Sequence, residues 1–440
     1  MHSDIFLYFC IAKSDYMRRT YIKPVISFFQ NIKARGLQFS RSGKLRPGFT
    51  GNFVFLLLSL GVVTFIAQSD FVSHDLPKEK ILEENTIAPA FTDDDLLFYR
   101  DTITELLLQQ NFNGTVLLAR DETILFSRSF GFADFRNHTP LNPETPFQLA
   151  SISKTFTAAA ILLLQEEGGL DIDDPVREHI PEFPYEDITV RMLLTHTSGL
   201  HNYMYLVERY WKKETPPDNE DMLELFVRHQ SGLNFRPGTR FAYSNTGYAF
   251  LGLIIERVSG KSYADFLKEN IFDPLGMPNT FAYDLHSQEQ ARSDRAYGFR
   301  RWGRAHLLIP DVDHDGVMGD KGIYSNIIDL YTWDRAINNG KLLPEHRWEE
   351  ASEYTRLANN NPVRYGMGWR LQTFLDKKVV HHPGRWNGFR TSFRRYVEDD
   401  ATLIILTNTN RDVTPFVRRL ENILFMEEIA SQRLLAEAGE

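Results

Sequence analysis

The order in which helical and strand-like patterns follow one another limits the fold of this chain more than any other feature. A predicted helix at 92–110 precedes a predicted β-hairpin at 114–126. Further strands and a closing helix are predicted only near the other end, at 378–382, 388–397, 401–408 and 414–436. This order favours one antiparallel sheet assembled from both ends of the chain, with a helical subdomain inserted at about 150–300.

Local signals mark where these elements begin and end. Thr92, followed by three Asp residues, is predicted to cap the first helix, and Thr414 with Pro415 to open the closing helix. Turns are predicted at the Pro-Gly pair 383–384 and at 398–400. Between the two ends, apolar residues at helical spacing predict helices at 151–165, 221–230, 247–258 and 263–270.

Composition places the chain among folded proteins of enzyme size. Its 440 residues are 42% apolar and 13% aromatic, which excludes a disordered or collagen-like chain and allows a core without disulfides. Cys10 is the only cysteine, and one thiol allows neither an internal disulfide nor a cysteine-based zinc site. None of these features predicts an oligomeric state.

A basic segment followed by an apolar run marks the N-terminal part of the chain. Residues 1–50 contain nine Lys or Arg against two Asp, although the whole chain carries a net charge of -9. The stretch 47–69 is uncharged and mostly apolar, and a membrane-spanning helix needs about 20 such residues. Because positive flanks stay in the cytoplasm, we expect 51–69 to anchor the chain in the cell membrane as a single span, with the following body extracytoplasmic.

A cleaved signal peptide is the alternative, because Ala67-Gln-Ser69 resembles a small-x-small cleavage site. About fifty residues precede the apolar run, whereas the charged region of a signal peptide is short, so an uncleaved anchor is favoured. Residues 70–91 then form a spacer and 92–440 the folded domain. Since the basic block belongs to the membrane flank and the domain is acidic, no nucleic-acid partner is expected.

A Ser-x-x-Lys pattern opens the predicted helix at 151–165. Residues three apart share one face of a helix, so the amine of Lys154 can reach the hydroxyl of Ser151. Burial can lower the pKa of a lysine until it accepts a proton from serine, and a helix N-terminus favours negative charge on an attacked carbonyl. A capping or solvated serine is the structural alternative, because the pattern alone is common.

A Tyr-x-Asn pattern occurs twice downstream. Tyr243 and Asn245 precede an apolar helix, where a phenol can act as base or proton relay and an amide can hold a substrate carbonyl. Tyr324 and Asn326 match the same pattern, so either pair can instead be a buried tyrosine beside a turn asparagine.

A third polar stretch, 381–385, follows an apolar strand. Adjacent histidines on a strand point to opposite faces, so His381 and His382 are poor metal ligands, and no metal site is predicted. A strand that lines a cleft fits better, because Pro383 is tolerated only at a sheet edge and leaves the N–H of Arg385 free to donate to an oxyanion.

Two other patterns favour structural interpretations. Asp311–Gly316 imitates the first half of a calcium-binding EF-hand loop, but its twelfth position is Gly322 rather than Glu. His196 and Ser198 form a potential catalytic pair, yet their position before Gly199 at a helix end favours a turn.

Taken in order, these motifs resemble the serine β-lactamase and penicillin-binding-protein superfamily, in particular its class C β-lactamase, D-alanyl-D-alanine carboxypeptidase and esterase branch. The likeness covers about 95–435 and includes the stretches Phe147–Thr157, Gly169–Pro175, Leu193–Gly199, Tyr243–Tyr248 and Gly319–Ser325. It implies an α+β fold of the β-lactamase/transpeptidase type, with an antiparallel sheet flanked by the N- and C-terminal helices and an inserted all-helical subdomain.

The resemblance also implies a role for each motif residue and no metal or organic cofactor. It makes Ser151 the acylated nucleophile, with proton transfer shared by Lys154 and Tyr243. The implied substrate-binding residues are Asn245, His382, Gly384 and Arg385, and the oxyanion hole is the backbone N–H groups of Ser151 and Arg385.

One departure from the family affects the expected substrate. The third motif of typical β-lactamases is Lys-Thr-Gly, whereas His382 and Pro383 stand here. A histidine is mostly neutral at pH 7, so it binds a carboxylate less firmly than lysine does. We therefore expect a serine hydrolase for D-amino-acid peptides or small esters, with β-lactams as further candidates. The alternative from another class is a low-turnover sensor or non-catalytic binding module with the same fold.

Overall fold

The structure is a computed structural model that describes residues 91–438 except 230–231, 284, 287–293 and 304, and excludes the side chains of 433–438. The predicted basic segment, the predicted membrane span and all but the last residue of the predicted spacer lie outside the described residues. Within the described part, no helix combines the length and the apolar character needed to cross a bilayer.

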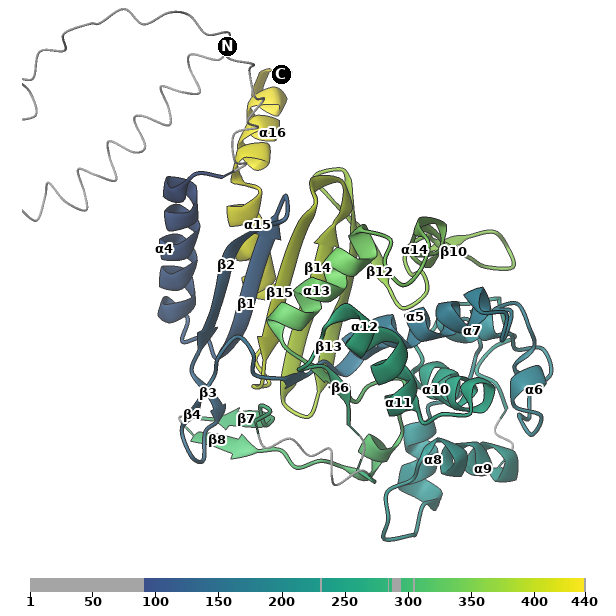
Figure 1. The fold of residues 1–440 in the computed structure, drawn as a ribbon. Helices are drawn as coiled ribbons and strands as arrows, with labels where there is room; N and C mark the ends of the chain where they lie inside the picture. Colours follow the sequence, from purple (N-terminus) through teal and green to yellow (C-terminus); the bar gives the residue numbers. More distant parts are fainter. Residues whose placement is uncertain (1–90, 230–231, 284, 287–293, 304, 439–440) are drawn as a thin grey trace, which may run out of the picture. The chain divides into compact units, whose positions relative to one another are not determined.

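A six-stranded antiparallel sheet forms the centre of the domain (Figure 1). Its strands, in spatial order, are β12 (Arg370–Phe374), β13 (Lys377–Trp386), β14 (Phe389–Tyr396), β15 (Ala401–Thr407), β1 (Gly114–Arg120) and β2 (Thr123–Phe130). The pairing of β1 with β15 joins the two ends of the described domain, for example Leu117 opposite Ile404. The prediction of an antiparallel sheet built from both ends is confirmed.

The predicted turn at 383–384 is wrong, because β13 continues through it to Trp386. β12 pairs with β13 only as far as His381, so Pro383 lies where this edge is open and its missing N–H removes no ladder hydrogen bond. The turn to β14 is made by Asn387 and Gly388, whose φ angles of 34° and 87° suit a tight hairpin turn.

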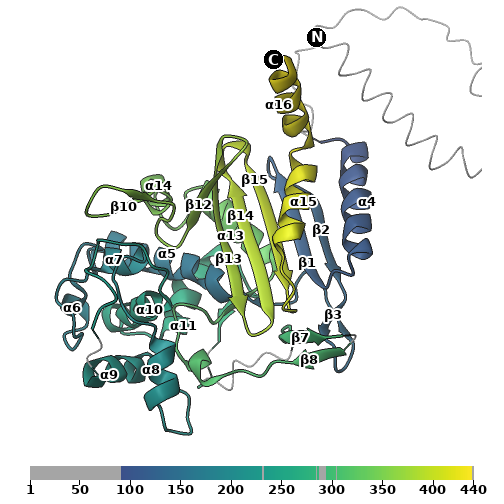
Figure 2. The ribbon, with the colours of Figure 1, turned by 180° about the vertical axis from the view of Figure 1, so that it is seen from behind.

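Helices cover both faces of the sheet (Figure 2). On one face, α4 (Asp93–Gln109) and α15 (Thr414–Leu424) bury their apolar residues against strand side chains that point to that face, such as Leu118 and Leu403. On the other face, α13 (Ile327–Asn338) packs on β15 and β1, whose residues there belong to the larger core. The flanking N- and C-terminal helices are therefore confirmed.

The two flanking helices begin in different ways. Thr92 caps α4 through a reciprocal capping box with Asp95, as predicted. Thr414 is instead the first residue of α15, and its N–H and hydroxyl donate to Asp412 at 3.0 and 2.8 Å. The single closing helix predicted to reach 436 is wrong, because Phe425 separates α15 from α16 (Met426–Ala438).

The inserted segment is mainly helical. Its helices are α5 (Ser153–Glu166), α6 (Val176–His179), α7 (Val190–Leu194), α8 (Tyr203–Tyr210), α9 (Asn219–His229), α10 (Asn245–Ser259), α11 (Tyr263–Leu267), the π-turn η3 (Lys268–Phe272) and α12 (Asp273–Leu275). The predicted apolar stripe of α5 is buried, but so is every residue from Ser153 to Leu164. The helix lies between the sheet and the helical subdomain and is covered on all sides. The predicted apolar stripe indicated burial of one face only.

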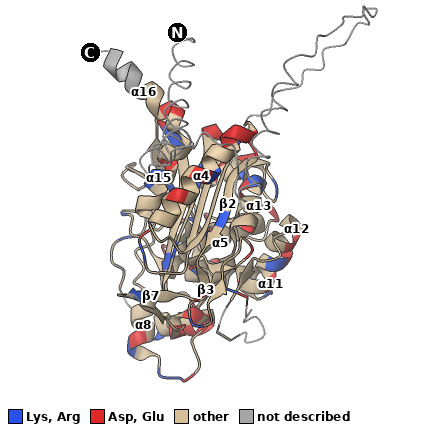
Figure 3. Ribbon diagram, turned by 90° about the vertical axis from the view of Figure 1, so that its left-hand side faces the viewer, with Lys and Arg blue, Asp and Glu red and all other residues tan. Residues whose placement is uncertain are grey.

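Shorter elements complete the described part of the chain. They are β3 (Phe132–Asp134), β4 (Thr139–Pro140), β5 (Phe147–Gln148), η2 (Ala150–Ile152), β6 (Phe281–Ala282), β7 (Phe299–Trp302), β8 (Ala305–Leu308), η5 (Asp313–Gly316), β9 (Ile323–Ser325), α14 (Glu345–Ala351), β10 (Thr355–Arg356), β11 (Pro362–Val363) and η6 (Val397–Asp399). The charged residues of the domain are mixed in sign. Figure 3 shows Lys and Arg interspersed with Asp and Glu over the described domain rather than gathered in one stripe.

Candidate active site

Ser151 lies in the short turn η2 that leads into α5, two residues before that helix begins at Ser153, whereas the sequence predicted it to be the first helical residue. The preceding residue, Ala150, has a φ of 54°, a left-handed conformation that costs a non-glycine residue about 1–2 kcal/mol. Two contacts hold this strained turn: the N–H of Leu149 donates to the carbonyl of Ile323 at 2.8 Å, and the hydroxyl of Thr391 donates to the carbonyl of Leu149 at 3.0 Å. The neighbouring segments thus fix the backbone that presents Ser151.

Lys154 is fully buried beneath Ser151. Its Nζ lies 2.7 Å from the backbone carbonyl oxygen of Asp320, 3.0 Å from Oδ1 of Asn245 and 3.4 Å from Oγ of Ser151. Burial lowers the pKa of Lys154 to about 8; the charge of Asp320 opposes this shift and that of Arg370 adds to it. A substantial fraction of the amine is therefore neutral near physiological pH, and a neutral amine can accept the proton of Ser151.

Tyr243 reaches Ser151 from the loop before α10. Its hydroxyl hydrogen-bonds to Ser151, and its ring centroid lies 5.1 Å from Nζ of Lys154. Desolvation raises the pKa of Tyr243 above its usual value even though the residue as a whole is 36% exposed; the bond to Ser151 and the charge of Arg370 act in the opposite direction. The phenol is therefore protonated at neutral pH, which suits a proton relay better than a phenolate base.

The second Tyr-x-Asn pair, Tyr324 and Asn326, has a structural role. Tyr324 is buried in β9, and its hydroxyl accepts a hydrogen bond from Arg295 at 2.5 Å. Asn326 caps α13 by accepting from the N–H of Asp329 at 2.7 Å. Neither residue lines the cavity that contains Ser151.

His196 supports Tyr243. The histidine is buried, its ring centroid lies 4.3 Å from that of Tyr243, and its Nδ1 accepts from the N–H of Ser244 at 3.2 Å. Burial, followed by the positive charge of Lys154, lowers the pKa of His196 well below its usual value. These contacts agree with the predicted structural role of His196. Its packing against the ring of Tyr243 was not predicted.

His382 lies in β13 as a neutral, buried side chain. Its Nδ1 is 2.8 Å from the carbonyl oxygen of Pro383, so Nδ1–H donates there and Nε2 accepts from the hydroxyl of Tyr365 at 3.2 Å. Burial, then the charges of Lys154 and Arg370, lowers the pKa of His382 well below its usual value. The imidazole therefore offers no cation to a substrate carboxylate.

Gly384 lets β13 approach the nucleophile turn. A Cβ atom at this position would overlap the carbonyl oxygen of Leu149 and the hydroxyl of Thr391. These two atoms form the hydrogen bond that holds the turn before Ser151. The glycine is thus needed for close backbone approach, not for an unusual φ angle.

Arg370 was missed by the sequence analysis. It is the first residue of β12, opposite His381 in the register, and its guanidinium carbon lies 5.0 Å from the ring centroid of Tyr243. No motif marks it, because the pairing of β12 with β13 alone brings it beside the third motif. It supplies at the site a permanent cation that His382 does not.

These residues surround one cavity of about 680 Å³. Six of the seven predicted site residues line it, namely Ser151, Tyr243, Asn245, His382, Gly384 and Arg385, and Arg370 lines it as well. Lys154 lies buried below, within reach of Ser151. The structure thus brings all the predicted residues together from segments up to about 230 positions apart in the sequence.

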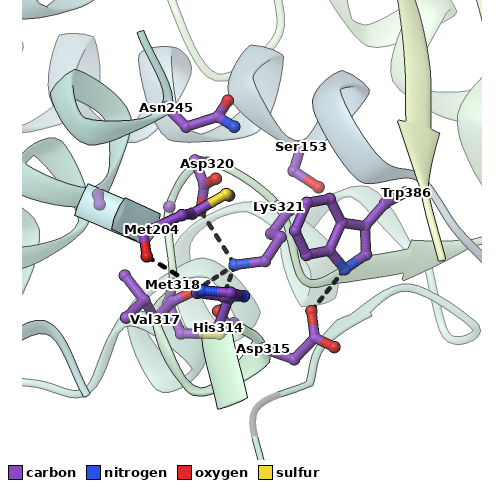
Figure 4. Close-up of polar contacts among 12 residues, drawn as sticks. Ser153, Met204, Asn245, His314, Asp315, Val317, Met318, Asp320, Lys321 and Trp386 are labelled. Carbon is purple, nitrogen blue, oxygen red and sulfur yellow. Dashed lines mark hydrogen bonds and ion pairs between the residues drawn. The ribbon is translucent and has the colours of Figure 1, made fainter. Parts of the chain in front are cut away.

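A buried polar cluster includes Asp320, whose backbone carbonyl accepts from Lys154 (Figure 4 shows the cluster). Its centre is Lys321, whose Nζ donates to the hydroxyl of Tyr203 at 2.9 Å and to the carbonyl of His314 at 2.5 Å, and lies 3.4 Å from Oδ1 of Asp320. Because the backbone carbonyl of the same Asp320 accepts from Lys154, the cluster holds that acceptor in place.

Asp315 connects this cluster to the cavity wall. One of its carboxylate oxygens accepts from Nε1 of Trp386 at 2.6 Å (Figure 4). The other accepts from Nδ2 of Asn387 at 2.9 Å. Within the part of the chain that the structure describes, no group of three or more His, Cys, Asp or Glu is arranged to hold a metal ion. The EF-hand-like stretch at 311–316 instead anchors the β13–β14 turn.

Comparison with known proteins identifies the family of the chain. The sequence profile of the β-lactamase family matches residues 99–426. Penicillin-binding protein 4* of Bacillus subtilis is 37% identical over 74% of this chain and 75% of its own length, and a D-aminopeptidase of Brucella anthropi is 26% identical over 74% of this chain and 62% of its own length. A penicillin-binding protein from Bacillus halodurans has a similar structure, with a TM-score of 0.63 and 25% identity over 73% of this chain and 98% of that protein.

The predicted fold class is thereby confirmed in its β-lactamase/transpeptidase-like part. The profile match spans most of the chain, and the relatives are penicillin-binding proteins and D-aminopeptidases. The chain therefore belongs to the β-lactamase family of serine hydrolases.

Proposed function

We propose that the chain hydrolyses an ester or amide through an acyl-enzyme on Ser151. The observation that carries this proposal is the buried Lys154, whose pKa is lowered to about 8 and whose amine lies 3.4 Å from Oγ of Ser151. The Tyr243 hydroxyl hydrogen-bonds to the same serine, so it can relay the proton taken from Ser151 to the leaving group. A capping serine needs neither neighbour.

The proposed reaction balances protons within these three groups. Oγ of Ser151 attacks the substrate carbonyl carbon while neutral Lys154 accepts the serine proton. The N–H groups of Ser151 and Arg385 are assigned to the resulting oxyanion. When the bond to the leaving group breaks, Tyr243 protonates that group and regains a proton from Lys154. Water then repeats the sequence on the acyl-enzyme and releases the acid.

We assign Asn245 to hold the substrate carbonyl and Arg370 to hold a substrate carboxylate. Oδ1 of Asn245 accepts from Lys154, which leaves the amide N–H₂ of Asn245 to face the cavity that Asn245 and Arg370 line. Arg370 provides the fixed charge that a carboxylate needs, whereas His382 is neutral. The favoured substrates are D-amino-acid peptides or small esters, and the D-aminopeptidase relative supports the peptide class.

The location of the domain belongs to the same proposal. The basic segment and the apolar run at 51–69 support a membrane-anchored enzyme whose domain lies outside the cytoplasm, where cell-wall peptides occur. This part rests on the sequence alone.

The test is covalent labelling of the purified full chain with a fluorophosphonate, followed by peptide mass spectrometry. We expect one adduct on Ser151, its loss in Ser151→Ala and its retention in Ser153→Ala, since Ser153 is buried in α5 and does not line the cavity. Labelling that persists in Ser151→Ala would refute the proposal. Labelling without turnover of any ester or D-peptide would favour the sensor instead.

A further inference from the structure

Two arginines face each other at the rim of the cavity. Arg385 on β13 and Arg390 on β14 are direct cross-strand partners, and both line the cavity that contains Ser151. Like charges directly opposite each other destabilise a β-sheet. Among the described residues, neither guanidinium forms an ion pair with a carboxylate that would offset this repulsion.

The same face of the sheet shows how such a charge is neutralised elsewhere. Side chains two or four positions apart on a strand share a face, so Arg394 and Arg390 both point toward α15. Arg394 pairs with Glu421 of α15 at 2.9 Å. Arg390 lies near the beginning of that helix, and among the described residues its guanidinium donates to the carbonyl of Phe389, at 2.8 Å, and pairs with no carboxylate. The strand thus pairs one arginine and leaves the other open to the cavity.

One carboxylate lies among the residues that line this cavity, and it is already engaged. Asp412 accepts hydrogen bonds from the N–H and the hydroxyl of Thr414. Burial, then the charge of Arg385, lowers the pKa of Arg390, and Asp412 only partly opposes this. Together with Arg370, the pair makes three arginines that line one cavity in a chain whose net charge is -9.

The arginine pair also belongs to a second hollow. This cavity of about 450 Å³ is lined by Ile309, Arg385, Trp386, Asn387, Gly388, Arg390 and Asn410. The indole of Trp386 is held by Asp315, so this wall is fixed. The pair therefore lines both the cavity around Ser151 and a neighbouring hollow that also contains Ile309 and Trp386, where the far part of a longer substrate could bind.

We propose that Arg385 and Arg390 form a subsite for an anionic group, a carboxylate or a phosphate, on the part of the substrate that extends past the scissile bond. This inference rests on the proposed function and deepens it by defining the substrate class. The anion accepts charge-assisted hydrogen bonds from both guanidinium groups and relieves their mutual repulsion. Occupied by such a group, the cross-strand pair is stable rather than strained.

The first experiment compares matched substrates on the full chain. In the first pair the leaving group varies: N-acetyl-D-alanine is esterified with the phenol of 4-hydroxyphenylacetate (anionic) or of its amide (neutral). In the second pair the acyl group varies: the nitrogen of a D-alanine ester carries a glutaryl group (anionic) or a glutaramyl group (neutral). In at least one pair, we expect the anionic member to have the higher kcat/KM, and its advantage to fall about tenfold in Arg390→Gln. Arg356→Gln, on the exposed β10, makes the same charge change and should leave the ratio intact. A ratio near one in both pairs, or a ratio unchanged in Arg390→Gln, overturns the proposal.

The second experiment measures binding without catalysis. Phosphate and glutarate are titrated separately into Ser151→Ala and into Ser151→Ala/Arg390→Gln, with the unfolding temperature as the readout. We expect at least one anion to stabilise the first protein and not the second, and the two titrations separate phosphate from carboxylate. Stabilisation that is equal in both proteins, or absent in both, refutes the subsite. Loss of Ser151-dependent turnover with normal anion binding would instead contradict the proposed function.

Discussion

At the scale of single residues, burial decides the chemistry more than residue type does. Lys154 is a lysine with an ordinary pKa in the unfolded chain, and burial lowers that pKa to about 8 in the folded one. Tyr243 and His382 are shifted by the same cause in directions that keep both neutral. The resulting site contains an amine whose pKa is about 8, a protonated phenol and a neutral imidazole, with Arg370 as its fixed cation.

The pH dependence of acylation follows from the lowered pKa of Lys154. The amine is protonated below about pH 8 and neutral above it, so kcat/KM for a neutral ester should rise through pH 8 and level off. Arg370→Gln removes a repelling charge and should move the midpoint to higher pH, whereas Asp320→Asn removes an attracting charge and should move it lower. Midpoints that stay fixed in both variants would exclude Lys154 as the titrating base.

Replacing a single hydroxyl tests the proton relay. Tyr243→Phe keeps the ring against His196 but removes the group that bonds to Ser151. We expect kcat/KM to fall by about 10²–10⁴ while the unfolding temperature changes little. Tyr324→Phe, in the rival motif, serves as the control: it loses the bond from Arg295 and should cost stability without a comparable loss of turnover. Equal turnover in the two variants would remove Tyr243 from the mechanism.

At the scale of elements, β13 and the turn η2 are built as one unit. The strand is open at its edge beyond His381, and Gly384 brings its backbone against the turn that presents Ser151. The loop that contains Asp315 and Asp320 fixes both the hairpin end of β13 and the acceptor beneath Lys154. The geometry of the site is therefore held by contacts among three segments that lie far apart in the sequence.

A methyl group at position 384 should separate two of these segments. In Gly384→Ala the new Cβ meets the Leu149 carbonyl and the Thr391 hydroxyl, so β13 or the turn must move. We expect a loss of about 1–3 kcal/mol in the free energy of unfolding, together with slower fluorophosphonate labelling. Gly232→Ala is the matched control, because nothing lies within 4 Å of a Cβ there. Labelling at the wild-type rate in Gly384→Ala would show that close approach is not required.

At the scale of the whole molecule, the sheet joins the first strands of the described domain to its last, while the catalytic segments come from between them. All the residues assigned to the site lie within the described domain. The proposed anchor lies outside it, so location and catalysis are expected to be separable.

Fractionation tests that separation. We expect the full chain to sediment with membranes, and a chain that starts at residue 91 to remain in the supernatant, because only the former carries the apolar run at 51–69. Fluorophosphonate labelling of Ser151 should be equal in the two. A full chain that stays in the supernatant would contradict the anchor, and labelling lost on truncation would show that the domain needs the preceding residues.

The sequence by itself determined the order of the elements, the fold class and the three motifs of the site. Capping at Thr92, the strand patterns at both ends and the Ser-x-x-Lys spacing are local signals. They depend only on residues near one another in the sequence, so the sequence alone reveals them. Tertiary structure alone decided that β13 continues through Pro383, that Arg370 enters the cavity and that Arg385 faces Arg390. Strand pairing sets these three features, and pairing depends on partners that sequence spacing does not reveal. Burial likewise appears only when distant segments meet, and it gives Lys154 its lowered pKa.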